Sequence, residues 1–117
     1  MDIVKFYHTI GVAPEPVVRR LINGSIVEKY LLKFINDGTY HQLSEMVRQG
    51  QYSQAAQAAH TLKGLALNLE LIPLAKESAA LLEELRLPDP VPEKIDDAFE
   101  KLSETYRTVI GKLQACQ

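Results

Sequence analysis

One segment limits the fold more than any other. The stretch from Tyr52 to Leu69 contains no proline and is rich in alanine and leucine. Both residue types favour helix, so the stretch predicts a long helix. Prolines and glycines bound further amphipathic stretches along the chain, and no convincing alternation of apolar and polar residues indicates a strand. The sequence therefore predicts an all-α protein.

The breakers also set the extent of the other helices. Pro14 and Pro16 suit the first turn of a short helix that runs to about Ile22. Ser25 followed by Glu28 is a capping-box pattern that starts the next helix. Helices are predicted at about 14–22, 26–35, 40–48, 52–69, 73–87 and 93–114, after an N-terminal turn at 3–8.

The loops between these helices are short, which favours antiparallel neighbours. Only the connector at 88–92 is stiff and extended, because it carries three prolines. We therefore expect residues 1–117 to form a single domain. Its predicted architecture is an antiparallel up-and-down four-helix bundle with short additional N-terminal helices.

Composition excludes several classes of function. The 117 residues are 46% hydrophobic and 24% charged, as in an ordinary globular domain. A net charge of -2 argues against nucleic acid as a partner, because phosphate backbones bind basic surfaces. No apolar run is long enough for a membrane span, and no signal peptide is recognisable, so we expect a cytoplasmic protein. The single Cys116 is expected to be incidental, and a monomer is expected at this size and charge.

His60 lies in the middle of the predicted helix at 52–69. On a helical wheel of about 100° per residue it points away from the apolar side. That side carries the residues expected in the core, which are Ala55, Ala58, Leu62, Leu65, Ala66 and Leu69. A lone histidine on a helix is usually an ordinary polar residue, so its neighbours decide whether it does more.

Four neighbours on the His60 face are unusual for a solvated helix surface. Lys63 places a cation beside the ring, where it can stabilise a phosphoryl group. Gly64 costs about 1 kcal/mol relative to alanine inside a helix, a cost that makes sense if another molecule approaches the imidazole closely. Ala56 and Leu67 are apolar on a face expected to be wet, which predicts a docking surface.

These residues match a known family. Ala58-Ala59-His60-Thr61-Leu62-Lys63-Gly64, continuing through Ala66, Asn68 and Leu69, resembles the signature of histidine-containing phosphotransfer (HPt) domains. The resemblance extends from about Ile10 to Leu87, and includes the helix before the histidine helix and the returning helix after it. The His-x-x-Lys-Gly core is short, and its alanine-rich context with Asn-Leu at i+8 and i+9 makes it specific.

The resemblance implies a reaction and the roles of several residues. His60 would accept a phosphoryl group, on Nε2, from a receiver-domain aspartate and pass it to another receiver in a His–Asp phosphorelay. Lys63 would neutralise the group, and Gly64 would leave room for the partner's active site. Gln57 and Arg86 are weaker candidates for contacts near the phosphate.

The resemblance also makes the chain a phosphocarrier and not an enzyme. Its partners would be response-regulator receiver domains and/or a hybrid sensor histidine kinase. Magnesium and the catalytic carboxylates would belong to the receiver. We expect no cofactor or metal in this chain, because it has no glycine-rich phosphate loop, and His8 and His41 lack ligands at metal-binding spacing.

Two other interpretations fit parts of the sequence. A helical docking or adaptor module would bind signalling partners without carrying phosphate; Ala56 and Leu67 would serve it, but Lys63 and Gly64 would have no special purpose. A phospho-acceptor domain of a larger kinase is a second alternative. The starting methionine and the lack of an evident linker argue against it.

One position departs from the family pattern. The family usually has glycine after Asn-Leu, where the histidine helix turns its corner, and this chain has Glu70. A residue other than glycine rarely adopts φ > 0. We therefore expect another form of turn, which leans on Pro73.

Overall fold

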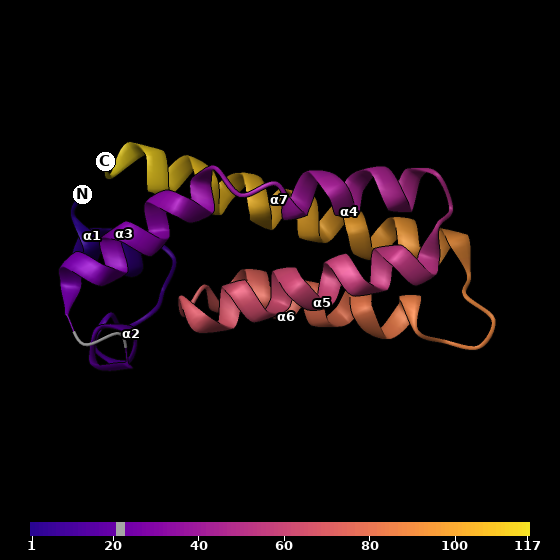
Figure 1. Ribbon diagram of the computed structural model, residues 1–117, viewed down its shortest axis with the longest axis horizontal. Helices are drawn as coiled ribbons and strands as arrows, with labels where there is room; N and C mark the ends of the chain where they lie inside the picture. Colours follow the sequence, from indigo (N-terminus) through magenta and orange to yellow (C-terminus); the bar gives the residue numbers. More distant parts are fainter. Residues whose placement is uncertain (21–22) are drawn as a thin grey trace.

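The computed structural model describes residues 1–20 and 23–117, and all regular structure in these ranges is helical (Figure 1). The helices are α1 (Ile3–Thr9), α2 (Glu15–Arg20), α3 (Gly24–Ile35), α4 (Thr39–Arg48), α5 (Tyr52–Asn68), α6 (Ile72–Leu85) and α7 (Pro92–Ala115). The predicted all-α class is confirmed. The predicted end of the second helix at Ile22 lies outside the described residues.

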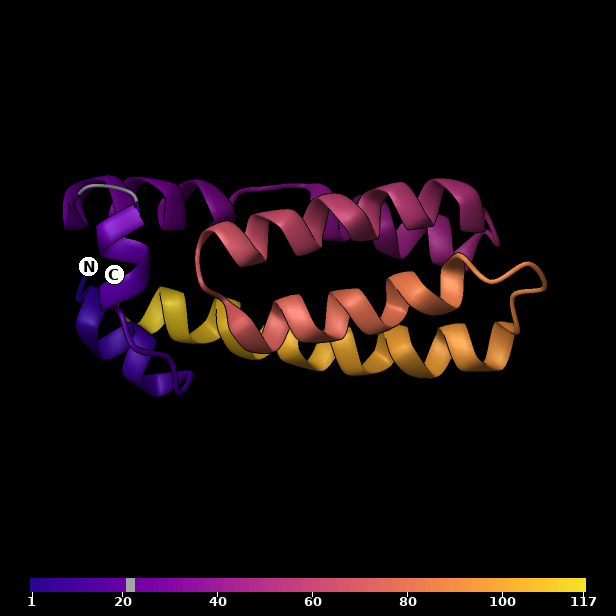
Figure 2. The same ribbon diagram turned by 90° about the horizontal axis from the view of Figure 1, so that it is seen from below.

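The four C-terminal helices run along the long axis of a molecule that measures 43 × 24 × 22 Å. Helix α5 packs against α4 and α6, and α6 packs against α7. The chain reverses direction after α4, α5 and α6 (Figures 1 and 2). Helix α3 precedes α4 along the same side of α7, and α1 and α2 lie with α3 at the end where α5 finishes.

The core follows the apolar faces expected from the sequence. In α5, the side of the helix opposite His60 is buried, and Ala55, Leu62 and Ala66 have no exposed surface. Alanine at most of these positions lets neighbouring helices approach α5 closely. The core is completed by leucines of α6 and α7 and by aromatic rings of α1, α3 and α7.

Helix α3 does not begin with the predicted capping box. Asn23 is its N-cap residue, and the Asn23 side chain accepts a hydrogen bond of 3.0 Å from the Ile26 amide. Glu28 instead accepts a hydrogen bond of 3.0 Å from the amino group of Met1. Asparagine caps a helix at least as well as serine, and it comes first in the chain, so the helix starts one residue before Ser25.

The corner after α5 corrects the prediction for Glu70. This residue adopts φ 54°, in the left-handed region that usually favours glycine. The Leu71 amide donates to the Ala66 carbonyl at 2.8 Å, and the Glu70 amide donates to the Leu67 carbonyl at 3.2 Å, which is the Schellman pattern. The expectation of another form of turn was therefore wrong.

The N-terminal helices supply the contacts that hold this corner. Arg20 donates to a Glu70 carboxylate oxygen at 2.7 Å, to the Leu67 carbonyl at 3.2 Å, and to the Asn68 carbonyl. The Tyr7 hydroxyl donates to the Leu69 carbonyl at 2.6 Å. Burial raises the pKa of Tyr7 above its ordinary value of 10.0, the Glu70 carboxylate adds to the rise, and Arg20 opposes it. These contacts fix the C-terminal end of the helix that carries His60.

Candidate functional site

His60 lies near the middle of α5, with its side chain exposed to solvent. Its helix neighbours Ala59 and Leu62 are fully buried and anchor α5 in the core. No side chain in the described part of the chain makes a hydrogen bond to the imidazole ring. The ring is therefore exposed on a helix that is anchored in the core, and no described residue occupies it with a hydrogen bond.

Lys63 and Gly64 lie on the same side of α5, one turn after His60. The Lys63 side chain is half-buried and forms no ion pair with any described residue. Gly64 is exposed, and a Cβ built on it would meet no atom within 4 Å. Packing inside the chain therefore does not explain why this helix position is a glycine.

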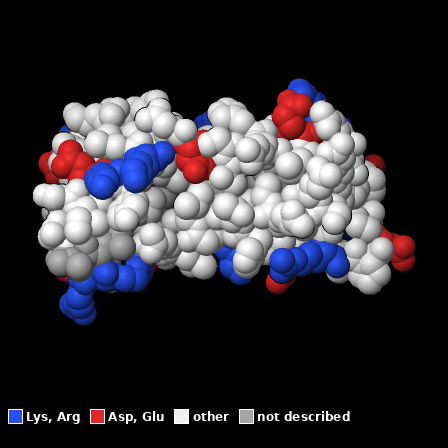
Figure 3. Space-filling model, in the orientation of Figure 1, with Lys and Arg blue, Asp and Glu red and all other residues white. Residues whose placement is uncertain are grey.

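Helix α5 itself carries few charges. Lys63 is the only Lys, Arg, Asp or Glu in α5. Figure 3 shows an uncharged area over the middle and right of the face drawn, with charged side chains over the left part, at the upper right and along the lower edge. A surface of this kind is more readily desolvated by a protein partner than a charged helix face is.

The structure brings Gln57 and Arg86 together in one groove of about 430 Å³. We call it the connector groove, because the segment between α6 and α7 forms one of its walls. Arg86 lies directly after α6, at its C-cap, and not inside the helix as predicted. The lining residues are Tyr52, Ser53, Ala56, Gln57, Leu85, Arg86, Leu87, Pro88 and Pro90.

The two predicted docking residues differ in exposure. Leu67 is 47% exposed, as expected for a residue that meets a partner. Ala56 is only 9% exposed and lies in the connector groove, so its predicted place on a wet surface was wrong. The end of α6 and the connector cover this part of α5, and a helical wheel drawn for one helix does not include such neighbours.

A second hollow on the other side of Gln57 was not predicted. It measures about 220 Å³, lies between α4 and α5, and is lined by Thr39, Gln42, Met46, Gln54, Gln57, Ala58 and Thr61. All of these residues are uncharged. The sequence feature that could have indicated this hollow is the repeat of amide and hydroxyl side chains at helical spacing in both α4 and α5. Gln57 thus lies between two hollows, one turn before His60.

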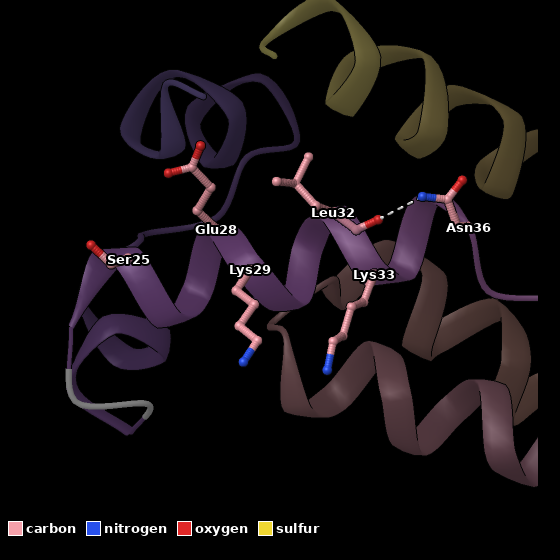
Figure 4. Close-up of a pocket in the computed structure, with 6 residues that line it drawn as sticks. All are labelled: Ser25, Glu28, Lys29, Leu32, Lys33 and Asn36. Carbon is pink, nitrogen blue, oxygen red and sulfur yellow. Dashed lines mark hydrogen bonds between the residues drawn. The ribbon is translucent and has the colours of Figure 1, made fainter.

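Another hollow of about 430 Å³ lies along α3 and is lined by Ser25, Glu28, Lys29, Leu32, Lys33 and Asn36 (Figure 4). Its two lysine side chains point away from Glu28. Asn36 donates to the Leu32 carbonyl at 3.4 Å. All six residues come from a single helix or its end, and none belongs to α5. This hollow therefore lies apart from His60, and the exposed face of α5 remains the candidate site.

Among residues 1–20 and 23–117, no group of three His, Cys, Asp or Glu side chains is placed to hold a metal ion. None of the helices described has both the length and the apolar composition that a membrane span requires. No protein-family model matches the sequence, and no curated protein or solved structure matches it either. Any assignment of function therefore depends on the chemistry of the site.

Proposed function

We propose that this chain is a histidine phosphotransfer protein of the HPt type. His60 accepts a phosphoryl group from a receiver-domain aspartate and passes it to an aspartate of another receiver. The observation that carries the proposal is the pairing of an exposed, centrally placed His60 with Gly64. No contact among the described residues explains this glycine, whereas close approach of a partner to the imidazole would.

The arrangement of the helices supports an HPt architecture. In this proposal α4 to α7 form an antiparallel up-and-down four-helix bundle, with α3 extending the line of α4 and with α1 and α2 as additional N-terminal helices. The packing of α5 between α4 and α6 and the reversals of direction agree with it. We propose one domain over residues 1–117, a monomer, located in the cytoplasm.

The proposed transfer needs little from this chain. A nitrogen of the neutral His60 ring attacks the phosphorus of the partner's phospho-aspartate, so that an N–P bond forms while the P–O bond to the aspartate breaks. The carboxylate leaves with the bonding electrons, and the proton on the other ring nitrogen stays in place. The reverse attack by a second aspartate completes the relay. The transition state is loose, so orientation and charge stabilisation dominate.

Lys63 contributes charge stabilisation in this proposal. A phosphoryl group carries a charge near -2, and the Lys63 ammonium can reach a group held on His60 from one turn away. Magnesium and the catalytic carboxylates are contributed by the receiver. The chain itself acts as a carrier and has no kinase or phosphatase machinery.

The test is transfer of radiolabelled phosphate from purified, phosphorylated receiver domains of the source organism. We expect acid-labile, base-stable label on the wild type and none on His60→Gln. His8→Gln is the matched control, because His8 is also exposed and lies on α1, outside the site. Label that survives in His60→Gln, or no label on the folded wild type from any receiver, contradicts the proposal.

The adaptor alternative has one observation in its favour, the exposed Leu67 on a helix that is nearly free of charge. An adaptor would bind its partner through this surface and would not use the imidazole. His60→Gln therefore separates the two functions in cells: an adaptor keeps its signalling output, whereas a phosphocarrier loses it.

A further inference from the structure

The connector groove lies beside the proposed phosphorylation site. Gln57 is three residues before His60 in α5, an axial distance of about 4.5 Å. The groove continues from Gln57 toward the start of α5 and is closed by the end of α6 and the connector. A partner that covers the His60 imidazole with a surface of ordinary size also covers the opening of this groove.

The groove combines apolar surface with a single cation. Leu87 is 45% exposed, and Pro88 and Pro90 flank it with a backbone that proline keeps stiff. Arg86 is exposed and forms no ion pair or side-chain hydrogen bond with any described residue. No acidic residue is among those that line the groove. The available guanidinium can therefore take up a carboxylate from outside, with a planar geometry suited to two hydrogen bonds.

We propose that the connector groove is a second contact with the receiver domain, in addition to the surface around His60. Its occupant is an acidic side chain from the receiver's docking surface, held by Arg86, with an adjacent apolar side chain packed on Leu87. The inference rests on the proposed function. Charge complementarity identifies the occupant, and the prolines make the groove largely pre-formed, so that little ordering accompanies binding.

This role differs from the phosphate contact that the sequence predicted for Arg86. The groove places Arg86 beside Ser53, Ala56 and Gln57, at the start of α5, and not beside Lys63 and Gly64. Arg86 is therefore placed beside the start of α5, before His60 in the helix, where the surface of a partner that covers His60 would meet it. A docking contact should affect transfer from a protein donor more than transfer from a small donor.

The experiment compares Arg86→Glu with wild type, using receiver domains phosphorylated by acetyl phosphate and, separately, phosphoramidate as a small donor that labels histidine directly. We expect the ratio of the receiver rate to the phosphoramidate rate to fall about tenfold in Arg86→Glu. Arg107→Glu is the matched control: it makes the same change of charge at an exposed position on α7, outside the groove, and its ratio should stay at the wild-type value.

The outcomes separate this inference from the proposed function. The docking role of Arg86 is overturned if the ratio of the receiver rate to the phosphoramidate rate is unchanged in Arg86→Glu, or if it falls equally in Arg107→Glu. In either case, labelling of the wild type by a receiver still supports the proposed relay. Equal losses with both donors assign Arg86 to the phosphate and also overturn it. Added salt should slow receiver transfer to the wild type more than to Arg86→Glu, because salt screens the proposed pair. Absence of label on the wild type from both donors contradicts the proposed function itself.

Discussion

Replacing Gly64 by alanine should make the protein more stable and less active. Gly64 is inside α5 and exposed, its φ is not left-handed, and an added Cβ would meet no atom within 4 Å. Alanine therefore enters without strain and gains about 0.8–1.0 kcal/mol in helix propensity. With about 2.1 cal/mol/K of unfolding entropy per residue over 117 residues, Tm should rise by about 3–4 °C.

The same methyl group lies one turn from His60, on the side where a receiver would approach in the proposed function. A displacement of about 1 Å between reacting groups can lower a rate about 100-fold. We therefore expect Gly64→Ala to slow transfer from a phosphorylated receiver by about that factor, with a much smaller effect on labelling by phosphoramidate. Thermal unfolding followed by circular dichroism, and initial rates of label transfer, measure the two effects on the same preparation.

Gly111→Ala is the matched control for this prediction. Gly111 is also exposed inside a helix, α7, and an added Cβ would again meet no atom within 4 Å. The Gly111→Ala substitution should raise Tm by a similar amount and leave phosphoryl transfer at the wild-type rate. Wild-type transfer in Gly64→Ala would refute the argument that the glycine gives the partner access. A lower Tm would refute the argument that the position is open.

Three further changes test other parts of the structure. Lys63→Gln should slow receiver-dependent transfer about tenfold at unchanged Tm, and a wild-type rate would remove Lys63 from the site. Tyr7→Phe removes the donor to the Leu69 carbonyl and should lower the unfolding free energy by about 1–2 kcal/mol at pH 7. The raised pKa of Tyr7 means that the folded state favours the neutral phenol. The difference in unfolding free energy between the wild type and Tyr7→Phe is therefore full below pH 10 and shrinks as the pH rises above it. Urea unfolding of both proteins should show a smaller difference at pH 11 than at pH 8. An equal difference at the two pH values contradicts the argument that burial raises the pKa of Tyr7. Glu70→Gly should leave the unfolding free energy of the wild type nearly unchanged, because the relief of left-handed strain is offset by the loss of the ion pair with Arg20. In an Arg20→Ala background the ion pair is already lost, so Glu70→Gly should raise the unfolding free energy by about 1 kcal/mol. Equal effects of Glu70→Gly in both backgrounds would show that Arg20 does not offset that strain.

The sequence predicted the helices and the buried side of α5 well. Prolines and glycines end helices for local steric reasons, so predicted ranges such as 52–69 and 93–114 lie within a residue of those of α5 and α7. The exposure of His60 also followed from local information, because the apolar residues of α5 repeat with the helical period. These features depend on residues only a few positions apart in the chain.

Features that depend on distant segments were not predicted. The burial of Ala56 requires the connector after α6 to fold over the start of α5. The left-handed Glu70 is contacted by Arg20, which lies 50 positions earlier in the chain and binds both its carboxylate and the end of α5. A helical wheel or a family pattern does not include such contacts. The sequence therefore did not predict the connector groove, and the prediction for the turn at Glu70 was wrong.

Glu70 and Gly64 both break a local rule within one helix and its corner, and the reasons differ in a way that bears on function. Glu70 is in a conformation that favours glycine, and the protein itself supplies the compensation through Arg20. Gly64 weakens a helix where alanine would fit, and no residue in the described part of the chain packs against the position that a Cβ would take. Sequences that fold well satisfy local preferences except where structure or function requires otherwise. Since the described structure accounts for Glu70 and not for Gly64, we propose that the requirement at Gly64 comes from another molecule, which would reach the imidazole of His60 beside it.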